Sequence, residues 1–203
     1  MRKYFLLYDE KATVNYKHLL KLYGIAEYNK KNRLYDTIRY NTLDELTSRI
    51  NDKYGKCISK STLADFLNDK GTKQKHEYRY FSYDKDSKTI HLTNNFSNVG
   101  KGAGAKFIVL SQKEFDFLVM QKDNLLIAYF LYIKYFCGAS TSKSTDFTAE
   151  QFLIACGLCP TSGSNKEKIS KYNSILSSSG LIEIERFRDN NGHLRNIYRI
   201  PLQ

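Results

Sequence analysis

Lysines and small polar side chains occur together at the starts of two predicted helices. The first set is Lys60, Ser61 and Thr62, and the second set is Ser164, Asn165, Lys166, Lys168 and Lys171. Ammonium, hydroxyl and amide groups can donate to phosphate oxygens or to purine edges. The amide groups at a helix start add further donors for a phosphate. These residue types therefore indicate recognition of a polyanion.

Further basic side chains fall on two predicted β-hairpins that follow these helices. The first hairpin has Lys85 and Lys88, and the second has Arg186, Arg188, His193 and Arg195. Placed along a nucleic-acid backbone or minor groove, they would make binding strongly salt-dependent. Any one of these residues alone fits an ordinary solvated surface, but their joint placement favours contact. Asp65 opposes the trend, because it would either accept from cytosine or weaken the approach of phosphate.

The elements that would position these side chains occur twice along the chain, in the same order. In the first half, Thr42 and Glu45 form a capping-box pair that opens a helix, which Gly55 ends. Ser59 is a good N-cap for the next helix, over 59–67. Strands over 78–83 and 89–93 then form a hairpin.

The second half repeats this order. Thr148 and Gln151 open a helix that Gly157 ends, and a second helix covers 166–179 and stops at Gly180. Strands over 181–188 and 194–201 form the second hairpin. A repeated supersecondary unit is the strongest indication of the overall fold. A hairpin after each second helix predicts an α+β protein with tandem winged helix-turn-helix domains. In such units the second helix enters the major groove.

The domain boundary is expected at 97–106, where three glycines and two lysines occur without helical or strand periodicity. We therefore predict a first winged-helix domain over 1–96, a glycine-rich linker over 97–106 and a second winged-helix domain over 107–203. A phosphate-binding loop is the alternative for this stretch, but the Gly-Lys-Ser/Thr ending of that motif is missing.

The apolar pattern predicts the remaining elements. Strands are expected over 3–8 and 107–110, a helix over 14–23, a short run over 37–40, and a central buried helix over 125–136. The latter is too short to span a bilayer, and no signal-peptide core is visible. The expected location is cytoplasmic, on nucleoid or mobile-element DNA, with no membrane partner.

The formal net charge of +11 and the pI of about 9.4 come from 32 Lys+Arg against 21 Asp+Glu. This excess favours a polyanionic partner but does not specify a fold.

Few sequence motifs support catalytic activity or metal binding. Cys156 and Cys159 have CxxC spacing, but no second ligand pair accompanies them, and zinc usually needs four ligands. The interpretation is that these two thiols, with Cys57 and Cys137, are buried and reduced. The four histidines fall in no catalytic or metal-binding motif, namely His18, His76, His91 and His193. We expect no enzyme activity, no metal and no cofactor.

The end of the second reading helix (166–179) and its hairpin resemble the DNA-binding segments of phage and plasmid replication initiator proteins. The matching residues are Leu176, Gly180, Leu181, Ile182, Asn196 and Tyr198. The resemblance covers about 107–201, and the first half matches more loosely through Leu46, Leu63, Leu67 and its hairpin. It implies double-stranded DNA, an origin or an operator, as the ligand. Transcriptional regulators share these features, so replication and transcription both stay open.

A competing hypothesis is a structural or assembly module, because tandem winged helices in chromosome-condensation accessory proteins contact proteins. A factor that binds a host protein is a third possibility. The net charge and the lysines on both reading helices favour double-stranded DNA, with a homodimer or replication and transcription proteins as further partners.

Overall fold

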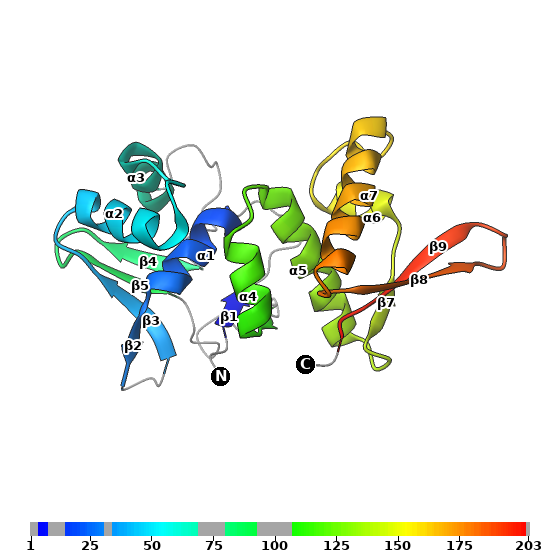
Figure 1. The fold of residues 1–203 in the computed structure, drawn as a ribbon, viewed down its shortest axis with the longest axis horizontal. Coiled ribbons are helices and arrows are strands. Elements are labelled where there is room, and N and C mark those ends of the chain that lie inside the picture. The colour runs from blue at the N-terminus through cyan, green and yellow to red at the C-terminus, as the bar shows by residue number, and fades with distance from the viewer. Residues whose placement is uncertain (1–3, 8–14, 31–33, 69–79, 93–106, 202–203) are drawn as a thin grey trace, which may run out of the picture. The chain divides into compact units, whose positions relative to one another are not determined.

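A computed structural model describes residues 4–7, 15–30, 34–68, 80–92 and 107–201 (Figure 1). The chain divides into two compact units. Unit 1 holds Met1–Leu7 and Val14–Lys122, and unit 2 holds Tyr8–Thr13 and Asp123–Gln203. Each unit combines helices with antiparallel strands, so the predicted α+β class is confirmed.

Unit 1 contains a four-stranded antiparallel sheet with strand order β2-β3-β5-β4. Its elements are α1 (Tyr16–Ile25), β2 (Glu27–Asn29), β3 (Leu34–Arg39), α2 (Leu43–Tyr54), α3 (Lys60–Asn68), β4 (Phe81–Asp84) and β5 (Thr89–Leu92). Leu19, Leu46 and Leu63 from the three helices are at most 1% exposed. The predicted first hairpin is confirmed over β4 and β5, while its outer positions 78, 79 and 93 lie outside the described residues.

Unit 1 also contains β1 (Tyr4–Leu7), β6 (Phe107–Leu110) and α4 (Gln112–Val119). β1 and β6 form an antiparallel pair, and the ring of Tyr4 stacks on Phe115 at 3.6 Å between centroids. The buried Lys21 of α1 donates to the carbonyl of Val119. The structure thus places β6 and α4 in unit 1, not with the second half as predicted, because β6 pairs with the N-terminal strand. The predicted linker at 97–106 lies outside the described residues.

Unit 2 has the strand order β7-β9-β8. Its elements are α5 (Asn124–Ala139), β7 (Ser144–Asp146), α6 (Ala149–Ala155), α7 (Gly163–Ser178), β8 (Glu183–Arg188) and β9 (Leu194–Arg199). α5 is the predicted central helix, with a continuous buried run over 126–133. The hairpin of β8 and β9 projects away from the helices of this unit (Figure 1).

The predicted helix ends are largely confirmed. Thr148 and Gln151 form the full capping box, and Gly157 and Gly180 have φ of 69° and 66°, which suits glycine because it lacks a Cβ. At Thr42 the prediction was half right. Its hydroxyl accepts from the amide of Glu45, but the Glu45 carboxylate accepts from the amide of Asn41, one residue before the cap.

Two short strands were missed by the sequence patterns. β2 has three residues, for which no strand was predicted, and β7 has the polar sequence Ser-Thr-Asp. β7 pairs with β9, with Ser144 opposite Arg199. Both strands are too short to show an alternating pattern, so tertiary pairing defines them. No helix of the described residues is long and apolar enough to cross a membrane.

Candidate nucleic-acid interface

The start of α3 presents the predicted polar residues to solvent. Leu63, Phe66 and Leu67 are buried, which leaves Lys60, Ser61, Thr62 and Asp65 on the exposed side. The hydroxyl of Ser59 accepts from the amide of Thr62 at 3.1 Å and so caps the helix. The sequence therefore predicted both faces of this helix correctly.

The polar groups of α3 already have partners within unit 1. The Ser61 and Thr62 hydroxyls lie 3.0 and 2.8 Å from the Ser59 hydroxyl. The Lys60 ammonium forms an ion pair with the Asp44 carboxylate of α2 at 2.6 Å. Lys60 and Asp65 are the only charged residues of α3, so this helix has no net charge.

The start of α7 shows a similar set of contacts. The helix begins at Gly163, three residues earlier than predicted, so Ser164 and Asn165 lie in its first turn. The Ser164 hydroxyl lies 3.0 Å from that of Ser162, and the Asn165 amide donates to the carbonyl of Cys159. Lys166 pairs with the Glu150 carboxylate of α6 at 2.7 Å.

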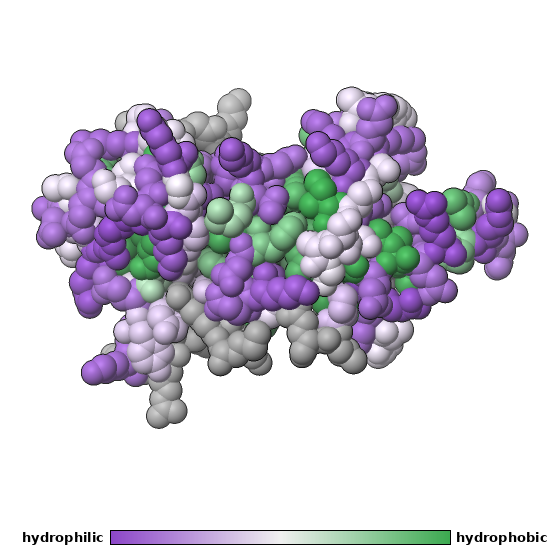
Figure 2. Space-filling view, in the orientation of Figure 1, coloured by the Kyte–Doolittle hydropathy of each residue, from purple (hydrophilic) through white to green (hydrophobic). Residues whose placement is uncertain are grey.

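Two lysines of α7 differ from these paired groups. Lys168 and Lys171 are exposed, and neither forms an ion pair within the described part of the chain. Residues three apart lie on the same helix face, so the two ammonium groups emerge side by side. α7 holds three lysines against Glu167 as its one acidic residue. Hydrophilic residues form most of the surface over the start of α7 and the β8–β9 hairpin (Figure 2).

The hairpin of unit 2 adds arginines in two different states. Arg186 and Arg188 are exposed, and Arg188 donates to the carbonyl of Gly192 at 2.9 Å. Arg195 is instead held within the hairpin, because its Nε donates to Asp189 Oδ2 at 2.8 Å. Of the predicted arginines, Arg186 and Arg188 are the better placed for an external ligand.

Asp189 organises the tip of this hairpin. Its carboxylate accepts from the amides of Asn191 and His193 as well as from Arg195. The hydrogen bond from Arg195, followed by the backbone bonds, lowers the pKa of Asp189 below its ordinary value. These bonds hold the charged form and fix the turn.

An aspartate has the same role in the hairpin of unit 1. Asp84 accepts from the amides of Asp86 and Ser87, and the bonds from Ser87 lower its pKa. Lys85 and Lys88 are exposed in the turn. The Lys85 ammonium lies 6.0 Å from the centre of the Tyr83 ring. The two basic residues are offset by Asp84 and Asp86.

A buried polar network joins α7 to the hairpin of unit 2. The Tyr129 hydroxyl donates to the Asn173 side chain at 2.8 Å and lies 3.0 Å from the Tyr198 hydroxyl. Asn196 of β9 also donates to Tyr198 at 3.2 Å. Burial raises the pKa of Tyr129 well above its ordinary value, so it stays neutral. The network thus joins α5, α7 and β9.

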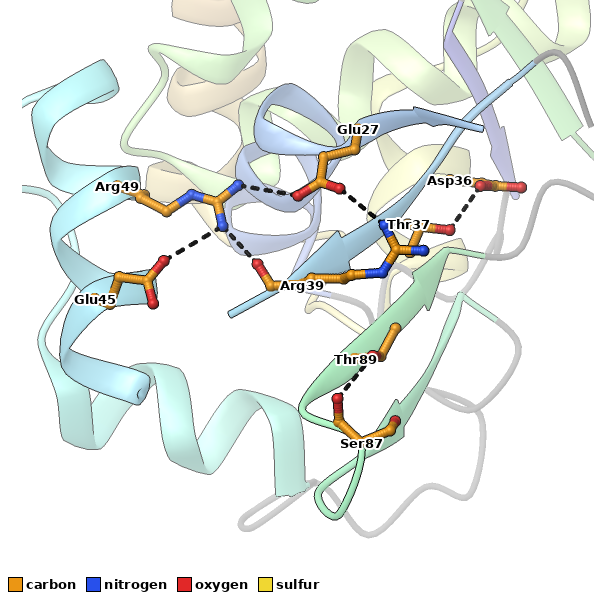
Figure 3. Close-up of polar contacts among 8 residues, drawn as sticks. All are labelled: Glu27, Asp36, Thr37, Arg39, Glu45, Arg49, Ser87 and Thr89. Atoms are coloured by element: carbon orange, nitrogen blue, oxygen red, sulfur yellow. Dashed lines mark hydrogen bonds and ion pairs between the residues drawn. The ribbon is translucent and has the colours of Figure 1, made fainter. Parts of the chain in front are cut away.

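A charged network of unit 1 was not predicted (Figure 3). Arg49 of α2 donates to the carbonyl of Arg39 at 2.6 Å and forms ion pairs with Glu27 and Glu45, both at 3.8 Å. Arg39 also pairs with Glu27 at 3.3 Å. These contacts join α2 to β2 and β3. No sequence pattern indicated the network, because Glu27 lies on a missed strand.

The interpretation of the four cysteines as buried thiols needs correction. All four are free, but Cys137 alone is buried, Cys57 and Cys156 are partly exposed, and Cys159 is exposed. Cys159 lies in the α6–α7 connection, where hydrogen bonds led by that with Thr161 lower its pKa. Burial raises the pKa of Cys156 to about 12, so the thiols of Cys156 and Cys159 differ in acidity.

Metal binding gains no support from the described residues, which contain no cluster of three His, Cys, Asp or Glu side chains suited to an ion. His18 is buried, and burial lowers its pKa to about 4. His76 lies outside the described residues.

The candidate interface thus has exposed ammonium and guanidinium donors on α7 and the β8–β9 hairpin of unit 2. Its equivalent in unit 1 has a paired lysine on α3 and two exposed lysines in the β4–β5 turn. Comparison of the chain with protein-family models, curated proteins and solved structures found no match in any of the three.

Proposed function

We propose that this protein binds double-stranded DNA through two winged helices, and that unit 2 makes the stronger contact. The supporting architecture is the order helix, strand, helix, helix, strand, strand. Unit 2 has this order throughout, and unit 1 has it over α1, β3, α2, α3, β4 and β5 once β1, β2, β6 and α4 are set aside. In each unit the strand after the first helix pairs with the last strand of the hairpin. A three-stranded sheet with a β-ribbon beside a helix-turn-helix is what a winged helix requires.

The observation that carries the DNA proposal is the basic face of unit 2. Lys168 and Lys171 extend from α7 with no ion pair in the described residues, and Arg186 and Arg188 are exposed on the hairpin that follows. A helix in the major groove and a ribbon along the adjacent backbone would use these four groups as phosphate or base-edge donors. The net charge of +11 acts in the same direction.

The biological role follows from the resemblance to replication initiators. Four of the six residues that carry it are at most 2% exposed, namely Leu176, Leu181, Ile182 and Tyr198. They therefore support the architecture more than a particular DNA sequence. We propose a role in replication initiation at a plasmid or phage origin, or in transcriptional regulation, on DNA in the cytoplasm.

A second candidate is an assembly module that contacts proteins, and the charge balance of unit 1 favours it for that unit. α3 has no net charge. The Tyr28 and Tyr35 rings, on the paired strands β2 and β3 of unit 1, are exposed, and their centroids are 5.1 Å apart. Exposed tyrosines are frequent in protein interfaces. Under this alternative unit 2 would also bind a protein and the lysines would be solvated.

Fluorescence anisotropy with a labelled random-sequence duplex separates the two candidates. We expect binding at about 50 mM salt and a steep loss by about 200 mM. Each phosphate contact releases counterions and so steepens the slope of log binding constant against log salt concentration by about 0.9. An absence of binding at the lower salt concentration would reject DNA as the ligand and leave the assembly module.

A further inference from the structure

The lysine that begins each basic face is held by a carboxylate at the same relative position in both units. Lys60 pairs with Asp44 and Lys166 pairs with Glu150, and both pairs are separated by 16 residues. The N–O distances are 2.6 and 2.7 Å. Unrelated surface pairs would not be expected to coincide in spacing, partner element and length.

Both carboxylates occupy the first turn of the helix that precedes the reading helix. Asp44 and Glu150 are each two residues after the threonine N-cap, Thr42 or Thr148. A negative charge is stabilised in the first turn by the helix dipole, so an acidic residue suits both positions. In each unit this carboxylate forms an ion pair with the lysine ammonium at or near the start of the next helix.

Stability alone explains these pairs poorly. The side chains are open to water, with exposures of 56% and 68% in the first pair and 47% and 52% in the second. Exposed ion pairs contribute about 0–1 kcal/mol. Each carboxylate also offsets one of the few positive charges near the start of α3 or α7, which lowers the attraction for an incoming phosphate.

We propose that Asp44 and Glu150 act as internal substitutes for a DNA phosphate, which hold back Lys60 and Lys166 and so restrain sequence-independent binding. This inference rests on the proposed function. Phosphate attraction supplies essentially all non-specific affinity, whereas discrimination depends on the ratio of specific to non-specific binding. A restrained lysine exchanges its carboxylate for a phosphate only where the remaining contacts fit. The two carboxylates are therefore specificity-determining residues, and Lys168 and Lys171 supply the unrestrained attraction.

The test is the double variant Asp44→Asn with Glu150→Gln, which removes both charges and keeps the side-chain shapes. We expect tighter binding to random duplex DNA and a salt dependence steeper by about 0.9 for each released lysine. Between about 50 and about 200 mM salt, the variant should lose roughly tenfold more affinity than the wild type. The thermal midpoint should stay close to that of the wild type.

The control is Asp52→Asn with Asp116→Asn, which changes the net charge equally at two exposed carboxylates outside α3 and α7. A second control adds Lys60→Gln and Lys166→Gln to the double variant, which should abolish the gain if the freed lysines cause it. Equal effects in the test and charge control, an unchanged salt dependence, or a gain that survives without the lysines would overturn the inference. If the wild-type protein fails to bind DNA at low salt, the proposed function fails instead.

Discussion

Units 1 and 2 have a common order of six elements and differ in the charge that these elements present. Both have a threonine-capped helix, a second helix with a buried apolar face and a hairpin whose turn is fixed by an aspartate. Yet α3 is electrically balanced, whereas α7 has three lysines against one glutamate. The comparison shows that similar cores and caps can carry exposed faces of different charge.

The largest expected effect tests the shared frame. Phe152 of α6 is 1% exposed and its counterpart Leu46 of α2 is fully buried. Phe152→Ala should cost about 3–5 kcal/mol and Leu46→Ala about 2–5 kcal/mol, because each leaves a cavity. Urea unfolding measures both.

The control for this prediction is on the same helix. Ile154 of α6 is 63% exposed, so Ile154→Ala should change stability by about 0.5 kcal/mol or less. A cost below about 1 kcal/mol for Phe152→Ala would show that the two cores are not built alike.

The next prediction sharpens the difference between the units. Lys168→Ala with Lys171→Ala should weaken binding to random duplex DNA on the order of tenfold and lower the salt dependence by about 0.9 per lysine. Lys60→Ala with Lys88→Ala should have a smaller effect, since Lys60 is already paired with Asp44. Anisotropy titrations of both variants test this difference.

The matched control for these titrations is Lys122→Ala with Lys143→Ala, two exposed lysines outside the reading helices and hairpins. Equal losses in all three double variants would show that binding responds to total charge alone, and that the contrast between the units has no functional meaning.

A smaller effect concerns the helix caps. Thr42 and Thr148 each accept a hydrogen bond at 3.2 Å from the amide three residues later. Replacement of either residue by alanine should cost about 1 kcal/mol, because that amide loses its partner. Thermal unfolding of the two variants, with Thr→Ser as the control that keeps the acceptor, tests whether the caps are equivalent. A cost in only one unit would break the comparison.

The smallest effect is a pH dependence of the two hairpin turns. Hydrogen bonds lower the pKa of Asp84 and of Asp189 in the folded protein. A depressed folded pKa contributes stability above the unfolded pKa of about 3.9, and this contribution is lost as pH falls through the folded pKa. The protection of the turn amides against exchange, relative to an unfolded peptide at the same pH, should therefore fall below about pH 4. Asp189→Asn should remove that dependence in unit 2 alone, and a persistent pH step there would contradict the assignment.

Local signals in the sequence were sufficient for the helices described above and for several of their ends. Thr148 with Gln151, and the glycines at 157 and 180, fix boundaries through short-range hydrogen bonds and positive φ angles. They were insufficient for elements that depend on distant partners. β7 exists because it pairs with β9, and β6 joins unit 1 because it pairs with β1.

The exposed faces of the reading helices were predicted, but their internal contacts were not. Lys60 and Lys166 were expected to be open to a ligand, and both are paired. Those contacts cross from one helix to the next, so they depend on the angle between the two helices, which no local pattern encodes. The repeated spacing of 16 residues was the available signal.

The most direct test of unit 2 as the DNA-binding unit is an NMR titration of the full chain with a short duplex at low salt. The account predicts that the largest amide shifts fall within 163–171 and 183–195, with smaller shifts at the start of α3 and in the β4–β5 turn. Shifts confined to unit 1, or none at all, would contradict it.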